Sequence, residues 1–227
     1  MKNNKAKKRS NFIYDFIKIT GILPALLWFR PKIYHVGDKK KHNVKGGVMI
    51  ISNHISFVDV ILLPCIFWKR RLYSLATKDL FNTEAKANFF TKVNCIIVDQ
   101  ENFSMSSFHA VADRLKEGKA VLAFPEGHVN QKDTQLQAFK SGIILMSHIG
   151  KAPILPVYIT KRDKWYQRTV AIMGDPIDIK ELCGERPSLA VMDEASKYVH
   201  EKELELENYY KENILKNKTT DKERTKK

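Results

Sequence analysis

The chain has 227 residues, of which 44% are hydrophobic and 28% are charged, and this composition excludes a collagen-like, wholly disordered or multi-span membrane protein. The length fits one compact domain with an appended element. Its 39 Lys and Arg residues outnumber 25 Asp and Glu residues and give a net charge of +14, which indicates an anionic partner: a membrane surface, a nucleic acid or a phosphorylated substrate.

The N-terminal segment is basic and then apolar. The first nine residues contain five Lys or Arg and no acid, and an apolar stretch follows from Phe12 to Phe29. This order is typical of a signal peptide, but Asp15 and Lys18 interrupt the stretch and no small-residue cleavage site follows it. The sequence therefore argues against secretion.

The same segment, residues 1–32, is predicted to attach the protein to an anionic membrane surface. It is slightly short for a helix that spans a bilayer, and a break between Gly21 and Pro24 predicts two short amphipathic helices in the interface. Basic residues near an anionic leaflet contribute about 1 kcal/mol each to such binding. An ordinary helix packed on the domain is the alternative. Three cysteines without a C-x-x-C pair indicate reduced, mostly buried thiols, so we expect a peripheral or monotopic protein on the cytoplasmic face.

The body of the chain, residues 33–200, alternates short apolar runs with segments of helical period. We expect strands at 47–52, 71–76, 95–98, 120–124 and 154–160. We expect helices at 57–67, 104–117 and 139–149. This alternation predicts a single α/β domain with a largely parallel central sheet flanked by helices. Residues 201–227 are assigned to a charged C-terminal helix and tail, and the helix from about 194 to 216 is expected to be exposed.

Two polar motifs follow predicted strands. Asn53-His54 and Glu126-Gly127 come directly after apolar runs, and ligands in such sheets bind beyond the carboxyl ends of the strands. If a loop at His54 folds into a helix, the carboxylate of Asp59 reaches back to one ring nitrogen and fixes the tautomer. The other nitrogen is then available to take a proton from an alcohol.

Four blocks of the sequence carry a family resemblance. They are His54 with Asp59, Phe124–Gly127, Phe139–Gly142 and Ala152–Val157. In order and separation these blocks resemble the glycerolipid acyltransferase family, whose best-known members are the 1-acylglycerol-3-phosphate acyltransferases of phospholipid synthesis. The resemblance implies that an acyl group passes from acyl-CoA or acyl-carrier protein to a hydroxyl of a lyso-glycerolipid, without a cofactor or a metal.

The resemblance also implies roles for individual residues. His54 is the general base that deprotonates the acceptor hydroxyl, and Asp59 orients it. The substrate-binding residues implied by the same blocks are Asn53, Ser56, Glu126, Gly127, His128 and Lys140.

The sequence departs from the family pattern at two positions. Val129 and Gln100 stand where the family usually has arginine, which binds phosphate through two charge-assisted hydrogen bonds. Either the acceptor has no phosphomonoester, or the charge comes from one of Lys78, His128, Lys132 and Lys140.

Three other classes of function remain to be weighed. A nucleic-acid binder fits the net charge, but no base-reading module is present, so we expect no nucleic acid partner. A Ser-His-Asp hydrolase would need Ser56 as nucleophile, and this serine does not lie in a G-x-S-x-G motif. A lipid-binding relative without activity would fit the missing arginines, although it would have no chemical need for both His54 and Asp59.

Overall fold

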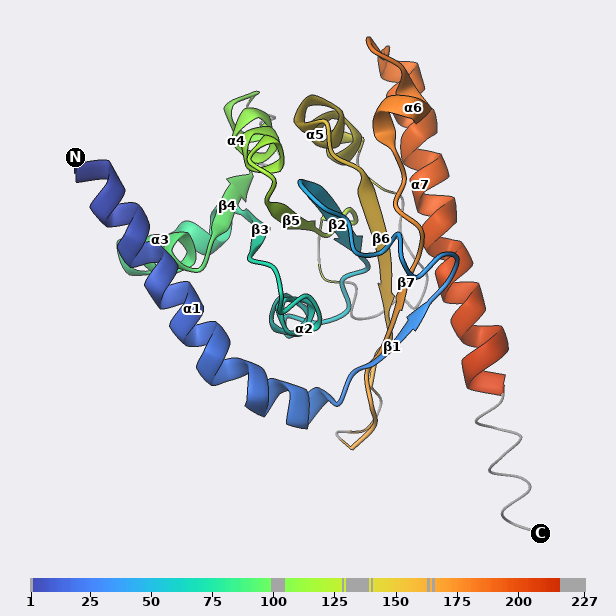
Figure 1. Ribbon diagram of the computed structural model, residues 1–227, viewed down its shortest axis with the longest axis horizontal. Coiled ribbons are helices and arrows are strands. Elements are labelled where there is room, and N and C mark those ends of the chain that lie inside the picture. The colour runs from blue at the N-terminus through green and yellow to red at the C-terminus, as the bar shows by residue number, and fades with distance from the viewer. Residues whose placement is uncertain are drawn as a thin grey trace.

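The computed structural model describes residues 2–98, 105–127, 129, 139, 141–162, 164 and 166–216, with side chains from residue 12 onward. Its centre is a seven-stranded sheet in the order β1-β7-β6-β2-β5-β3-β4, and only the β6–β7 pair is antiparallel. The strands are β1 (Lys32–His35), β2 (Val48–Ser52), β3 (Leu72–Thr77), β4 (Cys95–Val98), β5 (Ala120–Ala123), β6 (Ile154–Ile159) and β7 (Val170–Met173). The predicted α/β domain with a largely parallel sheet is confirmed (Figure 1).

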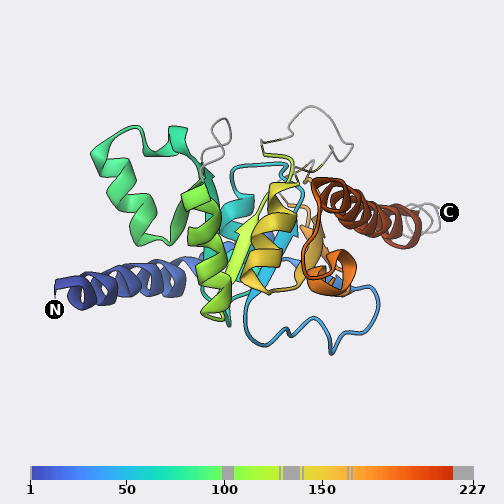
Figure 2. The same cartoon turned by 90° about the horizontal axis from the view of Figure 1, so that it is seen from above.

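Helices cover both faces of the sheet. They are α1 (Lys2–Phe29), α2 (Asp59–Ile66), α3 (Glu84–Lys92), α4 (Met105–Lys116), α5 (Gly142–Gly150), α6 (Ile179–Cys183) and α7 (Leu189–Tyr209). Two short helical turns, Lys78–Phe81 and Tyr210–Leu215, complete the described elements. Figures 1 and 2 show α1 and α2 on one side of the sheet and α4, α5 and α7 on the other.

The core is split in two by the alternation of side chains along the central strands. On β2, Met49 and Ile51 pack with α4, α5 and α7, whereas Val48 and Ile50 pack with α1 and α2. A strand in a sheet that is covered on both faces has apolar residues at successive positions, and this is why β2 can be predicted from the sequence. Full burial of each such side chain contributes about 1.5–3 kcal/mol to the free energy of unfolding. β2 therefore holds the start of the following loop in a fixed position.

The expected break in the N-terminal segment is wrong. α1 is one continuous helix that contains Pro24, and the structure carries no interruption at Gly21. Proline removes only one backbone hydrogen bond from a helix. Tyr14 before Pro24, and Ala25 and Phe29 after it, are buried against the domain, so the helix is supported on both sides of the proline.

The charges that interrupt the apolar stretch dock α1 onto the domain. Asp15 forms an ion pair with Arg71, and Lys18 Nζ donates to the carbonyl of Arg70 at 3.1 Å. The hydroxyl of Tyr14 accepts the backbone N–H of Leu72 at 3.0 Å. Burial lowers the pKa of Lys18. Polar groups on the inner side of α1 thus fix it beside β3, while Phe12, Phe16 and Leu23 face outward.

The sequence predicts an exposed C-terminal helix, and this prediction is wrong for one face of the helix. α7 begins at Leu189, where Ser188 caps its first turn, and its inner face buries Val199, Glu203 and Leu206 against the sheet. α7 continues past residue 200 without a break. The domain boundaries predicted from the sequence, at 32/33 and 200/201, stay a prediction. The three cysteines are free, as expected.

Candidate active site

The loop between β2 and α2 brings His54 and Asp59 together. β2 ends at Ser52, the chain turns through residues 53–58, and α2 begins at Asp59 itself. The distance between His54 Nδ1 and Asp59 Oδ2 is 3.1 Å. The strand-loop-helix arrangement therefore places a carboxylate on one ring nitrogen across a five-residue step that a continuous helix could not close.

Asp59 holds the loop as well as the imidazole. Its Oδ2 also accepts the backbone N–H groups of Ile55 at 2.8 Å and Ser56 at 2.7 Å, and the side chain is only 6% exposed. A buried carboxylate that accepts three donors is fixed in position. With Nδ1–H donating to Asp59, the tautomer of His54 has Nε2 as its proton acceptor.

The imidazole of His54 lies between two aromatic rings. It stacks on Phe124 with ring centroids 4.0 Å apart and an angle of 17° between the planes. Phe57 approaches edge-on at 6.5 Å. The side chain of His54 is 13% exposed, so the imidazole lies in an apolar environment with limited access to water.

Asn53 ties the loop to the neighbouring strand. Its side-chain amide donates to the carbonyl of Ile159 at 2.9 Å and accepts the N–H of Ile159 at 2.8 Å. Asn53 is buried, and this pair of bonds occupies both ends of the amide. In the described structure Asn53 thus fixes the His54 loop to β6, whereas the family resemblance had implied a contact with substrate.

Glu126 and Gly127 follow β5, the other neighbour of β2. Glu126 is buried, and its Oε1 accepts the backbone N–H of His54 at 3.3 Å. Gly127 has a φ of +77°, a conformation that glycine adopts without strain, and its N–H closes a turn on the carbonyl of Phe124 at 3.0 Å. Ser56 lies in the loop between β2 and α2, where its hydroxyl accepts the N–H of Val58 at 3.4 Å.

The sequence profile of the family described as Acyltransferase matches residues 33–160, which is more than half of the chain. The matched range includes the pair of His54 and Asp59 and the Glu126-Gly127 motif. The chain belongs to the acyltransferase family.

Individual relatives agree with this assignment. The protein named Taffazin from Dictyostelium discoideum is 34% identical over 113 residues, which are 46% of this chain and 39% of the relative. The 1-acyl-sn-glycerol-3-phosphate acyltransferase of Helicobacter pylori is 22% identical over 160 residues, 70% of this chain and 62% of the relative. The chain thus spans less than two thirds of the length of either relative.

A solved structure shares the fold. It is the 1-acyl-sn-glycerophosphate (LPA) acyltransferase, PlsC, from Thermotoga maritima, with a TM-score of 0.63 and 20% sequence identity. The likeness covers 89% of this chain and 82% of that chain. The α/β arrangement described above is therefore a known acyltransferase architecture.

The described residues cover only part of the predicted acyltransferase site. His128, Lys140, Lys132 and Gln100 lie outside them. Val129 is half-buried, and Lys78 is exposed directly after β3, at the same edge of the sheet as His54. Within the residues that the structure describes, no group of three or more His, Cys, Asp or Glu side chains is arranged to hold a metal ion.

A further acid, Glu203, lies behind the His54 loop and was missed in the sequence. It is fully buried on the inner face of α7. Burial and the charge of Glu126 raise the pKa of Glu203 well above its ordinary value, and the backbone N–H of Asn53 offsets part of this rise. Its position between Val199 and Leu206, at helical spacing on the buried face, was the available signal.

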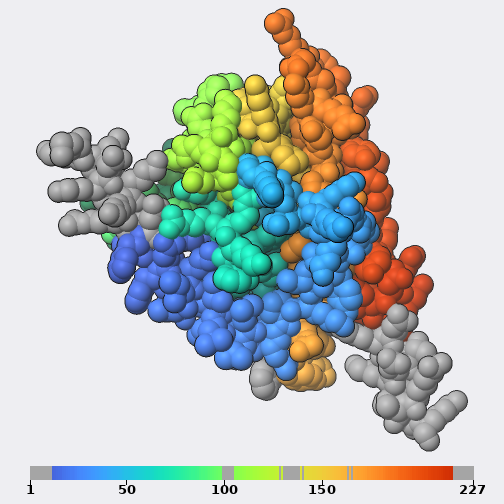
Figure 3. Space-filling view, in the orientation of Figure 1, coloured from blue at the N-terminus to red at the C-terminus, as the bar shows by residue number. Residues whose placement is uncertain are grey.

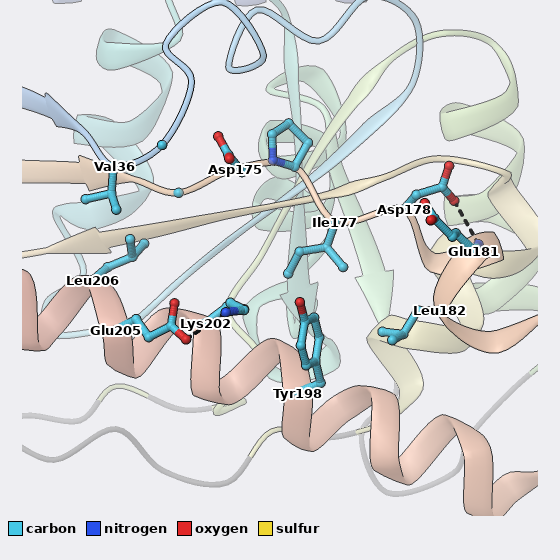
Figure 4. A pocket seen from close by; sticks show the side chains of 13 residues that line it. Val36, Asp175, Ile177, Asp178, Glu181, Leu182, Tyr198, Lys202, Glu205 and Leu206 are labelled. Atoms are coloured by element: carbon cyan, nitrogen blue, oxygen red, sulfur yellow. Dashed lines mark hydrogen bonds and ion pairs between the residues drawn. The ribbon is translucent and has the colours of Figure 1, made fainter.

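A separate cavity of about 620 Å³ lies between the β7–α6 connection and α7 (Figure 4). Acidic side chains of the β7–α6 connection and of α7 line it together with Tyr198 and Ile177, and Lys202 pairs with Glu205 at 2.7 Å. The cavity includes none of the residues that the family resemblance implies for substrate binding.

Proposed function

We propose that this protein is an O-acyltransferase that moves a fatty acyl group from acyl-CoA or acyl-carrier protein to a hydroxyl of a lyso-glycerolipid, in the manner of a 1-acylglycerol-3-phosphate acyltransferase of phospholipid synthesis. The observation that carries the proposal is the 3.1 Å contact between His54 Nδ1 and Asp59 Oδ2 at the carboxyl end of β2. Family membership and the named activity of the Helicobacter pylori relative support it.

The geometry suits direct transfer between the two substrates. His54 Nε2 takes the proton of the acceptor hydroxyl while the oxygen attacks the thioester carbonyl carbon. The carboxylate of Asp59 stabilises the imidazolium that forms. The tetrahedral intermediate collapses as the C–S bond breaks, the ester is formed, and the thiolate takes the proton back from Nε2. No covalent acyl-enzyme is needed.

A second acceptor class is favoured by one observation. Val129 supplies no charge where the family usually has arginine, and a carboxylate such as Glu126 suits hydroxyls and repels phosphate. An acceptor without a phosphomonoester is therefore the alternative substrate. Lys78, exposed at the same edge, is the described residue that could meet a phosphate instead.

The outer face of α1 supports attachment to a membrane. Residues Phe12–Phe29 have a mean hydropathy of 1.5, and 17% of them are buried, so this helix is long and apolar enough to cross a bilayer. We infer that it lies in the interface, because Tyr14, Asp15 and Lys18 hold its inner face on the domain. Figure 3 shows α1, in dark blue, beside α2, in turquoise, and exposed apolar side chains gather on both: Phe12, Phe16, Ile19, Leu23, Leu27, Trp28, Phe57 and Ile61.

This surface would place the site at the lipid boundary. Phe57 and Ile61 belong to the same loop and helix that carry His54 and Asp59. A bilayer that covers α1 and α2 would therefore bring lyso-lipids next to the base, on the cytoplasmic face where acyl thioesters are available.

The experiment that tests the proposed function is transfer of a labelled acyl group from acyl-CoA and from acyl-carrier protein to a panel of lyso-lipids with and without a phosphomonoester. His54→Ala is compared with His109→Ala, since His109 is exposed on α4. Transfer that is lost in the first variant and kept in the second supports the proposal. Equal turnover of both lipid classes favours the second acceptor class, and absence of transfer to every lipid contradicts the proposed function.

A further inference from the structure

The acid behind the active site lies near Asn53, which precedes His54, and near Glu126, which accepts the backbone N–H of His54. Glu203 is 0% exposed and extends from α7 toward the loops that follow β2 and β5. There it faces the backbone N–H of Asn53 and the carboxyl group of Glu126. Glu126 in turn accepts the backbone N–H of His54. Glu203 is thus one residue removed from the peptide that carries the base.

Burial of this carboxyl group works against folding. Within the described residues neither oxygen of Glu203 has a hydrogen-bond partner of good geometry. A leucine would fill a similar volume without burying a polar group. Neighbouring Glu207 also has an oxygen without a hydrogen bond of good geometry, but it forms an ion pair with Lys211 at 2.8 Å, and Glu203 has no such cation among the described residues. An unfavourable group placed directly behind a site is a candidate for a functional role.

We propose that Glu203 is a positioning residue: its buried carboxyl group packs behind Glu126 and keeps the carboxylate of Glu126 on the backbone N–H of His54. In the ionised form Glu203 would repel Glu126 and loosen the loop that aims His54. This inference rests on the proposed function, because it assigns Glu203 a part in aiming the base of that reaction.

The groups around Glu203 favour its neutral form. Glu126 faces it from the loop after β5, Glu207 from its own helix, and Tyr158 from β6. The first two raise the pKa of Glu203 in addition to the effect of burial, and the N–H of Asn53 is the group that opposes them. The pKa of Tyr158 is also raised, first by burial and then by Glu207, Tyr210 and Glu203, so this tyrosine stays neutral.

Three variants separate positioning from simple packing. Glu203→Gln keeps the shape and the neutral state, Glu203→Leu keeps the volume without a polar group, and Glu201→Gln changes an exposed glutamate on the same helix. We expect Glu203→Gln and Glu201→Gln to keep wild-type activity near neutral pH. Glu203→Leu should fold at least as stably as the wild type and lose about tenfold in kcat with an unchanged KM, because the base is misplaced.

Two pH series complete the test. The folded-state pKa of Glu203 is raised, so ionisation costs more in the folded protein than in the unfolded chain. With respect to this group, the wild type is therefore most stable below the ordinary pKa of a glutamate, and it loses stability as the pH rises toward the raised value. The thermal stability of Glu203→Gln relative to wild type should therefore increase with pH, and the ratio of their kcat values should increase likewise.

The outcomes distinguish the two claims. If the wild type is active and Glu203→Leu has the same kcat, the positioning role is overturned and the proposed function stands. The same conclusion follows if the ratio of the kcat of Glu203→Gln to that of the wild type does not change with pH. Wild-type protein that transfers no acyl group refutes the proposed function itself, and the positioning role falls with it.

Discussion

Replacing Asp59 by Asn separates the charge of this side chain from its shape. Oδ2 accepts His54 Nδ1–H and two backbone N–H groups, from Ile55 and Ser56, at 2.7–3.1 Å. Hydrogen bonds to a charged acceptor contribute about 1.5–3 kcal/mol, against about 0.5–1.5 kcal/mol for a neutral one. Loss of charge on the two backbone bonds alone should thus lower the free energy of unfolding by about 2.5 kcal/mol.

The effect on catalysis should be larger than the effect on stability. The asparagine oxygen that keeps the two backbone N–H groups also accepts Nδ1–H, so the tautomer is unchanged, but a neutral amide no longer stabilises the imidazolium that forms when Nε2 takes the proton. We expect kcat to fall on the order of 10²- to 10³-fold, because the lost charge interaction is made only as the proton is transferred. Urea denaturation and acyl transfer are measured side by side, with Asp113→Asn on the exposed face of α4 as the control. A folded Asp59→Asn protein with a kcat within about threefold of wild type would refute this reasoning.

Three further predictions concern backbone packing, the cysteines and the membrane face. Gly47→Ala should destabilise the protein by about 3 kcal/mol, because the new Cβ would clash with the backbone carbonyl of Leu115. Gly21→Ala has open space around the new Cβ and should stabilise α1 by up to about 1 kcal/mol. Urea denaturation measures both effects. Burial raises the pKa of Cys95 to about 11, so iodoacetamide at pH 8 should modify it much faster in urea than in the native protein, and equal rates would contradict the burial. Leu23→Glu, on the exposed face of α1, should reduce sedimentation with anionic vesicles without changing the thermal unfolding temperature, and unchanged sedimentation would show that another surface binds lipid.

Elements with strong local patterns could be predicted from the sequence. β4 was located with its observed bounds, and β2, β5, β6 and α4 to within one or two residues, because apolar runs and helical period mark elements that bury a whole face. β1 and β7 were missed. β1 is an edge strand in which Lys32 and His35 interrupt the apolar pattern, whereas β7 is a fully buried apolar run as long as β4, so its signal was present in the sequence.

The site was accessible only in part for a similar reason. The pair of His54 and Asp59 is local in sequence, so its spacing together with the preceding strand predicted the contact that the structure contains. The clamp between Asn53 and Ile159 joins residues 106 positions apart, and Glu203 approaches from the far end of the described chain. Such contacts depend on how β6 and α7 pack beside β2, which no local pattern specifies.

The central claim is that His54 lets the acceptor hydroxyl attack the donor thioester directly, and the most direct measurement follows the label during the reaction. A labelled acyl thioester and the preferred lyso-lipid are mixed with wild-type protein or His54→Ala, the reaction is stopped at short times, and both lipid and protein are analysed by mass. The account predicts label in the lipid ester alone, and only with the wild type. Label on the protein as a covalent intermediate, or ester formed at the wild-type rate by His54→Ala, would contradict it.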